Sequence, residues 1–228
     1  MKNKNEGTDH LLSNLERIKK ENSIFYYKAG RKAFKPLGQG EIAEWLEIFL
    51  PNTRIILEPN IIGSNIGIQY IDGKLKRAIN KNSEDITKRV MCQNNIPKEL
   101  AIKERLEIQG VLYNDESILN KENKNDSNVI ENSKSQLKKD RFCAYHIFHC
   151  NINHFQSLQE LKHLNFETPQ TQFTNFISDI EIYLQCWKDG KVFKNYPTKG
   201  IVLKINSRKF QKYLDENNIP INWAYSLS

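Results

Sequence analysis

Apolar residues recur with helical spacing at two places near the N-terminus. In residues 9–20, leucine and isoleucine fall on one face of a 3.6-residue repeat, and Thr8 stands where an N-cap residue would. A second stripe runs through residues 40–50, and its members are Ile42, Trp45, Leu46 and Phe49. Each stripe predicts a helix with one buried face.

The middle of the chain has the pattern of extended structure. An Asp72-Gly73 pair separates two such runs, and this pair is a strong signal for a tight hairpin. The predicted strands are residues 54–59, 63–70, 74–80, 105–113, 141–148 and 199–206.

Further helices are predicted between and after these strands. Ser83 is the expected cap of a helix that reaches residue 91, and residues 207–217 form a short final helix. Two capping boxes, Ser157 with Glu160 and Ser178 with Glu181, predict helices that reach about residues 164 and 188. Because hairpins are mixed with helices, the fold class is α+β rather than alternating β-α-β.

Residues 114–140 differ from the rest of the chain. They are dominated by Asn, Lys, Ser and acidic residues, and they contain no aromatic residue, Gly or Pro. Such a segment buries little apolar surface, so it predicts a flexible insertion or a solvated helix.

Positive charge is concentrated at the N-terminus. The net charge is +7, and residues 1–36 hold nine Lys or Arg against four acidic residues. This balance favours an anionic partner such as DNA or RNA, although an AT-rich genome also enriches lysine. The candidates for contact with a phosphate backbone are Lys28, Arg31, Lys32 and Lys35. Aromatic residues lie among them, so the segment is either a nucleic-acid contact or a solvated linker.

No segment predicts insertion into a membrane. The chain has no run of about 18 apolar residues and no apolar signal core at its N-terminus, so we expect no membrane span and a cytoplasmic location.

Cysteine and histidine gather in residues 143–154, which raises the question of a metal site. On a strand, Cys143 and His149 share one face, His146 and Cys150 share the other, and His154 follows. This two-faced spacing is poor for a tetrahedral site, so we expect no metal.

Seven segments in order along residues 40–228 resemble the adenylation domain of NAD-dependent bacterial DNA ligases. The most informative are "EPNIIG" (58–63), "LEIQGVLY" (106–113), "RFCAY" (141–145), "YPTKGIVLKIN" (196–206) and the tail "NWA" (222–224). The resemblance implies a nucleotidyltransferase fold with antiparallel sheets and flanking helices. It also implies two parts: a basic helical segment in residues 1–39, and a ligase-like domain in residues 40–228 with residues 114–140 as an insertion.

The chain departs from the family at the positions that carry its chemistry. The lysine that this family joins to AMP is Asn60 here, and the motif aspartate that follows it is Ile62. A strand glutamate is Val111, and a strand aspartate is Lys199. An amide nitrogen is not a usable nucleophile. Gly63 remains, and the turn needs it for backbone geometry or for a close approach.

Other family positions are retained, and they imply candidates for a nucleotide cleft. Glu58, Glu107 and Lys204 align with family residues, and Lys81 aligns loosely with the arginine of a phosphate-side loop. No catalytic role is assigned to them.

The resemblance with these losses implies a catalytically inactive ligase homologue that binds nucleic acid or a protein. Two alternatives stay open: residual nucleotidyl transfer from a relocated lysine (Lys28, Lys35 or Lys81), and a structural subunit of a larger assembly. We expect no cofactor, and weak binding of NAD is the alternative.

Overall fold

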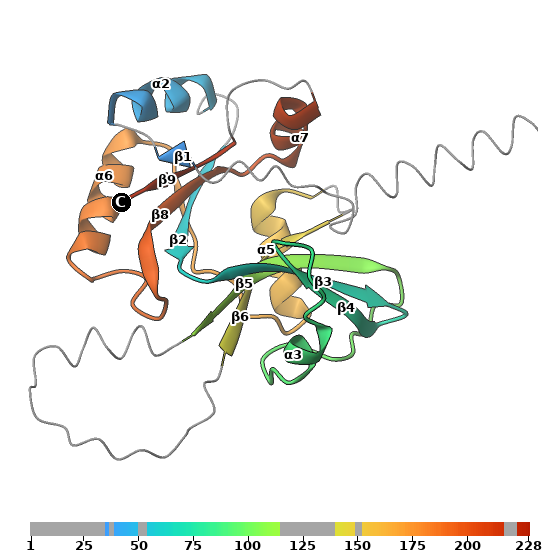
Figure 1. Ribbon diagram of the computed structural model, residues 1–228. Coiled ribbons are helices and arrows are strands. Elements are labelled where there is room, and N and C mark those ends of the chain that lie inside the picture. The colour runs from blue at the N-terminus through green and yellow to red at the C-terminus, as the bar shows by residue number, and fades with distance from the viewer. Residues whose placement is uncertain (1–34, 37–38, 50–53, 115–139, 149–151, 217–222) are drawn as a thin grey trace, which may run out of the picture.

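The computed structural model describes residues 35–36, 39–49, 54–114, 140–148, 152–216 and 223–228. The predicted helix at residues 9–20, three of the basic candidates (Lys28, Arg31 and Lys32) and most of the predicted insertion lie outside these residues. Figure 1 shows two β-sheets, each with its own helices. The α+β class with antiparallel sheets is confirmed.

The first sheet has five strands in the order β1-β9-β8-β2-β7. Its strands are β1 (Lys35–Pro36), β2 (Ile55–Ile61), β7 (Gln172–Thr174), β8 (Thr198–Ile205) and β9 (Ala224–Leu227). β2 pairs antiparallel with β7 and β8, and only β1 and β9 pair in parallel. Since β1 lies in this sheet, two residues of the predicted N-terminal segment belong to the folded domain.

The second sheet has four antiparallel strands in the order β4-β3-β5-β6. They are β3 (Ser64–Ile71), β4 (Lys74–Asn80), β5 (Leu106–Asn114) and β6 (Asp140–Ile147). The hairpin between β3 and β4 turns on Asp72 and Gly73, which have φ of 53° and 76°. Two successive positive φ angles are typical of the type I′ turn, so the predicted hairpin is confirmed.

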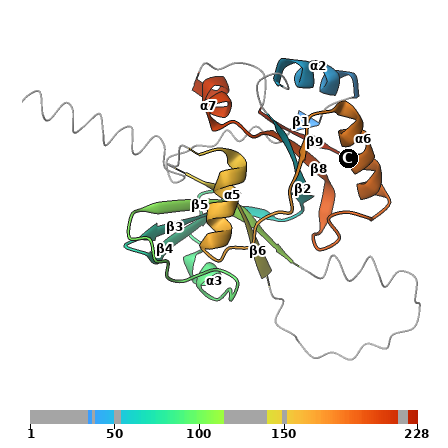
Figure 2. The same ribbon diagram turned by 180° about the vertical axis from the view of Figure 1, so that it is seen from behind.

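Each sheet closes its own apolar core against its own helices. α2 (Gln39–Phe49) contributes Trp45 and Leu46 to the first core, together with α6 (Ile177–Lys188) and α7 (Arg208–Glu216). α3 (Thr87–Met91) and α5 (His154–His163) cover the second sheet, and Leu158 and Leu161 of α5 enter its core. Figure 2 shows α5 lying across this sheet. In the described part of the chain, no helix has the length and apolar character needed to cross a bilayer.

The predicted helix caps were wrong, although the helices exist. α3 begins at Thr87, and Ser83 instead has a left-handed φ of 65° in the preceding turn. α5 begins after Asn153, so Ser157 lies inside the helix, where its hydroxyl accepts the N–H of Ile147 at 3.2 Å. In each case the serine matched a cap pattern, but the chain uses it elsewhere.

The start of α6 also differs from the predicted cap. The helix begins at Ile177 after Phe176, so Ser178 is in the first turn rather than at the cap. The hydroxyl of Thr174 accepts the N–H of Phe176 at 3.1 Å and donates to Asp179 at 2.8 Å.

The short strands β1, β7 and β9 were not predicted, because runs of two to four residues carry too little periodicity.

Asn206, which follows β8 of the first sheet, forms hydrogen bonds with α5, the helix that covers the second sheet. Its side-chain oxygen accepts the N–H of Phe155 and its backbone oxygen accepts the N–H of His154, both at 2.9 Å. Its own N–H donates to the backbone oxygen of Arg54 at 3.0 Å. The first sheet therefore satisfies two of the free N–H groups at the start of α5.

We predict that Asn206→Ala lowers the free energy of unfolding by about 1–2 kcal/mol, because it leaves a helix N–H without its acceptor. Asn206→Asp is the matched control, since it keeps the acceptor oxygen and places negative charge at a helix N-terminus. Urea unfolding followed by tryptophan fluorescence measures both. Equal losses in the two variants would contradict a capping role.

Candidate functional site

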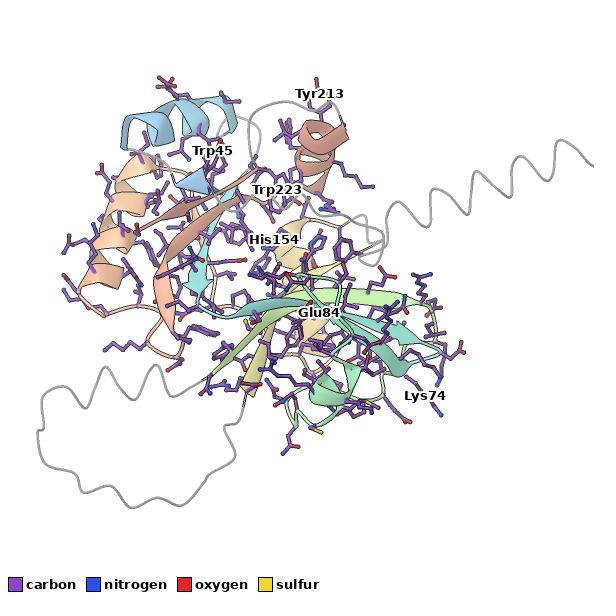
Figure 3. All side chains as sticks on the ribbon, in the orientation of Figure 1. Trp45, Lys74, Glu84, His154, Tyr213 and Trp223 are labelled. Atoms are coloured by element: carbon purple, nitrogen blue, oxygen red, sulfur yellow. The ribbon has the colours of Figure 1, made fainter. Side chains whose placement is uncertain are left out.

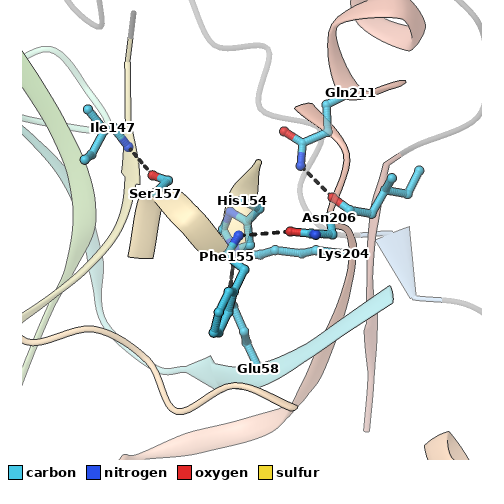
Figure 4. A network of polar contacts seen from close by, with 9 residues as sticks. Glu58, Ile147, His154, Phe155, Ser157, Lys204, Asn206 and Gln211 are labelled. Atoms are coloured by element: carbon cyan, nitrogen blue, oxygen red, sulfur yellow. Dashed lines mark hydrogen bonds and ion pairs between the residues drawn. The ribbon is translucent and has the colours of Figure 1, made fainter. Parts of the chain in front are cut away.

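Glu58 is the centre of a buried polar cluster between the two sheets (Figure 4). The Nζ atom of Lys204 on β8 lies 2.5 Å from its Oε2, and the Nε2 atom of His154 on α5 lies 2.6 Å from its Oε1. All three residues are at most 4% exposed. Successive side chains on a strand alternate between faces, so Ile55 and Leu57 enter the first core while Glu58 points away from it.

The charges of this cluster follow from burial and pairing. Burial alone would raise the pKa of the Glu58 carboxyl, but the charge of Lys204 and the hydrogen bonds from His154 and Lys204 lower it to about 2. Burial lowers the pKa of His154 more strongly than Glu58 raises it. At neutral pH we therefore assign a neutral His154 that donates its Nε2–H to an ionised Glu58, and Lys204 supplies the positive charge.

The second sheet completes the cluster. The ammonium of Lys204 lies 4.9 Å from the centre of the Tyr145 ring on β6, which is a cation–π contact. The Tyr145 hydroxyl donates to Oδ1 of Asn65 on β3 at 3.1 Å. Tyr145 also packs against the apolar core of the second sheet, so it connects that core with the polar cluster.

A cavity of about 300 Å³ opens beside the cluster. It is lined by β2 and the β2–β3 turn (Glu58, Pro59, Asn60, Ile61, Ile62, Gly63), by the second sheet (Asn65, Val111, Cys143, Tyr145), and by Pro169, Lys199, Val202, Lys204 and Ser226. A volume of this size lies at the lower end of small-molecule sites. Glu58 is its one carboxylate among the described residues, and Lys204 already neutralises that carboxylate.

The four positions where the sequence departs from the ligase pattern meet in this cavity. Asn60 lies near the end of β2 and is 9% exposed, whereas Ile62 in the following turn is 49% exposed. Val111 lines the cavity from β5, and Lys199 lines it from β8. Of the retained candidates, Glu58 and Lys204 also line it.

Gly63 makes the close approach that the turn was expected to need. A Cβ atom there would lie 2.5 Å from the backbone oxygen of Leu112 and 2.6 Å from Cγ1 of Val111. Any side chain would push the turn away from β5, so the glycine keeps the cavity wall in place.

Two predicted cleft residues lie elsewhere. Glu107 is fully buried on β5, where Arg105 and Gln69 donate to its carboxylate at 2.5 Å and 3.0 Å. Lys81 is exposed in the turn between β4 and α3. Neither is among the residues that line the cavity.

The Cys/His group is dispersed. Cys143 is buried in the cavity wall, His146 packs edge-on against Phe148 at 4.8 Å, and His154 is bonded to Glu58. His149 and Cys150 lie outside the described residues. Within those residues, no group of three His, Cys, Asp or Glu side chains could hold a metal ion.

Sequence reasoning missed His154 as a site residue. Its partner Glu58 is 96 residues away in the chain, so no local pattern connects them. Asn65 and Tyr145 were missed for the same reason, because strand pairing rather than sequence spacing brings them together.

The comparisons with known proteins agree with this architecture. No protein-family model matches the chain. It is 31% identical over 195 residues to a DNA ligase of Metamycoplasma arthritidis, a match that covers 74% of this chain and 29% of the ligase. It is 28% identical to a DNA ligase of Mycoplasma capricolum, with 76% and 30% covered. An archaeal ATP-dependent RNA ligase has a similar fold, with a TM-score of 0.51 at 11% identity, over 85% of this chain and 46% of that one.

Two largely antiparallel sheets with a cavity between them therefore define a nucleotidyltransferase-type adenylation fold. By sequence, the chain belongs to the family of ligase adenylation domains. It spans about 30% of the length of the DNA ligases that it matches.

We predict that Glu58 makes folding stability sensitive to acid. Its pKa is about 2 in the folded protein and 4.5 ordinarily, so its contribution is complete above about pH 4.5 and is lost as the pH falls toward 2. The linked free energy is roughly 3 kcal/mol. Glu58→Gln should lose stability at pH 7 and should show less of the decline between pH 5 and 3.

Glu104→Gln is the control, because Glu104 is exposed and should leave the wild-type pH profile unchanged. Urea unfolding at several pH values provides the measurement. If wild type and Glu58→Gln decline in parallel between pH 5 and 3, another group carries the acid sensitivity.

Proposed function

We propose that this chain is a catalytically inactive ligase-type adenylation domain that acts by binding the backbone of nucleic acid, with a protein partner as the alternative. The proposal is based on the side chains that line the cavity. Asn60 occupies the position that the ligase resemblance gives to the nucleophilic lysine, and the interior lysine, Lys204, is paired with Glu58.

Neither of these side chains is suited to attack a phosphorus atom. The nitrogen lone pair of the Asn60 amide is delocalised into its carbonyl, so it is a poor nucleophile. The ammonium of Lys204 donates to a carboxylate that remains ionised well below neutral pH. A lysine nucleophile must present its amine to the reacting phosphorus atom, whereas Lys204 is only 4% exposed and its Nζ is bonded to Glu58.

Residual nucleotidyl transfer is a second candidate because Lys199 also lines the cavity and is exposed. In that reaction, Nζ of Lys199 would attack the α-phosphorus of ATP or NAD. The N–P bond would form as pyrophosphate or nicotinamide mononucleotide departs, and the amine would lose a proton. The lysines named from sequence are less well placed: Lys28 is not described, Lys35 is on an edge strand, and Lys81 is outside the cavity.

The proposal includes no obligatory cofactor. Use of NAD rests on the resemblance alone, and any NAD binding in the altered cavity is expected to be weak. A structural role within a larger assembly remains the third possibility, and it requires co-purification of a partner.

We predict that incubation with ATP or NAD and Mg²⁺ leaves the intact mass unchanged and seals no nicked DNA. The double variant Asn60→Lys with Ile62→Asp should also remain unmodified, because Val111 and Lys199 still alter the cavity lining. Intact-mass spectrometry and a nick-sealing assay measure these outcomes.

Lys199→Gln is the matched control for this experiment. An adenylated wild-type protein would overturn the proposal of inactivity. If Lys199→Gln abolished that adduct, Lys199 would be the relocated nucleophile.

We predict that duplex DNA binding depends on salt with a slope of roughly −3 to −4.5 in log affinity against log salt, as expected for three to five neutralised phosphates. Changing Lys28, Arg31, Lys32 and Lys35 together to Ala should flatten the slope and weaken binding to all sequences alike. Lys204→Met should leave the slope unchanged, since Lys204 is 4% exposed. A fluorescence titration at several salt concentrations measures both, and no binding at low salt would leave the protein-partner alternative.

A further inference from the structure

The connection between α6 and β8 carries an uncompensated cluster of lysines. Residues 188–199 contain four lysines and one acidic residue, Asp189. Within this stretch, Lys188, Lys194 and Lys199 are exposed. None of these three forms an ion pair with an acidic side chain among the described residues. We call residues 188–199 the lysine connection.

The lysine connection starts from a well-defined helix end. Gly190 has a φ of 65°, and its N–H donates to the backbone oxygen of Trp187 at 2.9 Å. The N–H of Lys191 donates to the backbone oxygen of Cys186 at 2.8 Å. Together these bonds are the Schellman motif that ends many helices. The Lys191 side chain pairs with Asp189 at 2.8 Å, so we do not count it among the free charges.

Apolar residues between the lysines anchor the connection to the domain. Phe193 is 3% exposed and belongs to the first core, and Val192 and Tyr196 pack against that core. The indole N–H of Trp187 donates to the Thr198 hydroxyl at 2.8 Å. Because the backbone is held at these points, the lysine side chains extend from anchored backbone positions.

The lysine connection also borders the cavity. The N–H of Ile62 donates to the backbone oxygen of Pro197 at 2.7 Å, which joins the connection to the turn that forms one cavity wall. Lys199 itself lines the cavity. In Figure 1 the connection runs from the lower end of α6 to the start of β8.

We infer that the lysine connection is a contact surface for the phosphate backbone of nucleic acid, with Lys199 as the contact nearest the cavity. This inference rests on the proposed function and adds a contact surface in the described domain to the basic N-terminal candidates. Lysine ammonium groups spaced along a fixed segment suit a regular series of phosphates, and they carry no sequence preference. A protein partner fits less well, because lysine is depleted at the centres of protein interfaces.

The test compares two triple variants with equal loss of charge. One is Lys188→Gln, Lys194→Gln and Lys199→Gln. The control is Lys74→Gln, Lys76→Gln and Lys103→Gln, which removes three exposed lysines from the second sheet and its flank, and Figure 3 shows Lys74 on the side away from α6. Glutamine keeps most of the side-chain length in all six positions.

Labelled duplex DNA is titrated with the full chain between 50 and 200 mM salt. The lysine-connection variant should bind at least tenfold more weakly at the lowest salt, and its salt slope should be shallower by about 2–3, or 0.9 for each lost phosphate contact. The control variant should keep the wild-type slope. Thermal melting establishes that each variant is folded.

Equal weakening in the two variants would overturn the inference and leave the proposed function intact, because binding would then follow net charge alone. An absence of binding by wild type would overturn both. Displacement of DNA by polyglutamate at a lower charge concentration than by unlabelled DNA would assign the surface to an acidic protein and overturn the inference.

Discussion

The ionised carboxylate of Glu58 is the contact on which the arrangement of the two layers depends. It receives Lys204 from the neighbouring strand and His154 from the helix of the other layer. A buried charge is unfavourable unless its partners are correctly placed, so β2, β8 and α5 must keep one relative geometry. Asn206 reinforces this geometry by holding the first turn of α5.

The same contact determines what the cavity can do. The ammonium of Lys204 is hydrogen-bonded to Glu58 and packs over the Tyr145 ring, so both of its contacts lie within the protein. Asn60 supplies hydrogen-bonding groups in place of a nucleophile, and Lys199 at the cavity wall provides the exposed positive charge. Under the proposed function, these groups hold an anion and do not form a bond with it.

Much of the fold could be predicted because its signals are local. The Asp72-Gly73 turn and the alternating strands beside it are specified within a few residues, and the stripe through Trp45 and Leu46 marks the buried face of α2. Helix starts could not be predicted, because the fold uses hydroxyls such as that of Ser157 for contacts with other elements. The short strands were missed because only their neighbours in the sheet define them.

The site was predictable only where the resemblance named positions. It named Glu58 and Lys204, which line the cavity, and Glu107, whose carboxylate instead accepts hydrogen bonds from Arg105 and Gln69. Nothing in the sequence connects His154 with a carboxylate 96 residues away. Long-range polar contacts of this kind depend on how the layers meet, which a single sequence does not encode in any short pattern.

The separation of the two apolar cores has an evolutionary consequence. Asn60, Ile62, Val111 and Lys199 belong to neither core, although they stand on or beside the strands that build both. Mutations at these positions change the chemistry of the cavity without requiring either core to repack. A lineage could therefore lose a reaction and acquire a new ligand through single substitutions while its scaffold stayed under unchanged selection for folding.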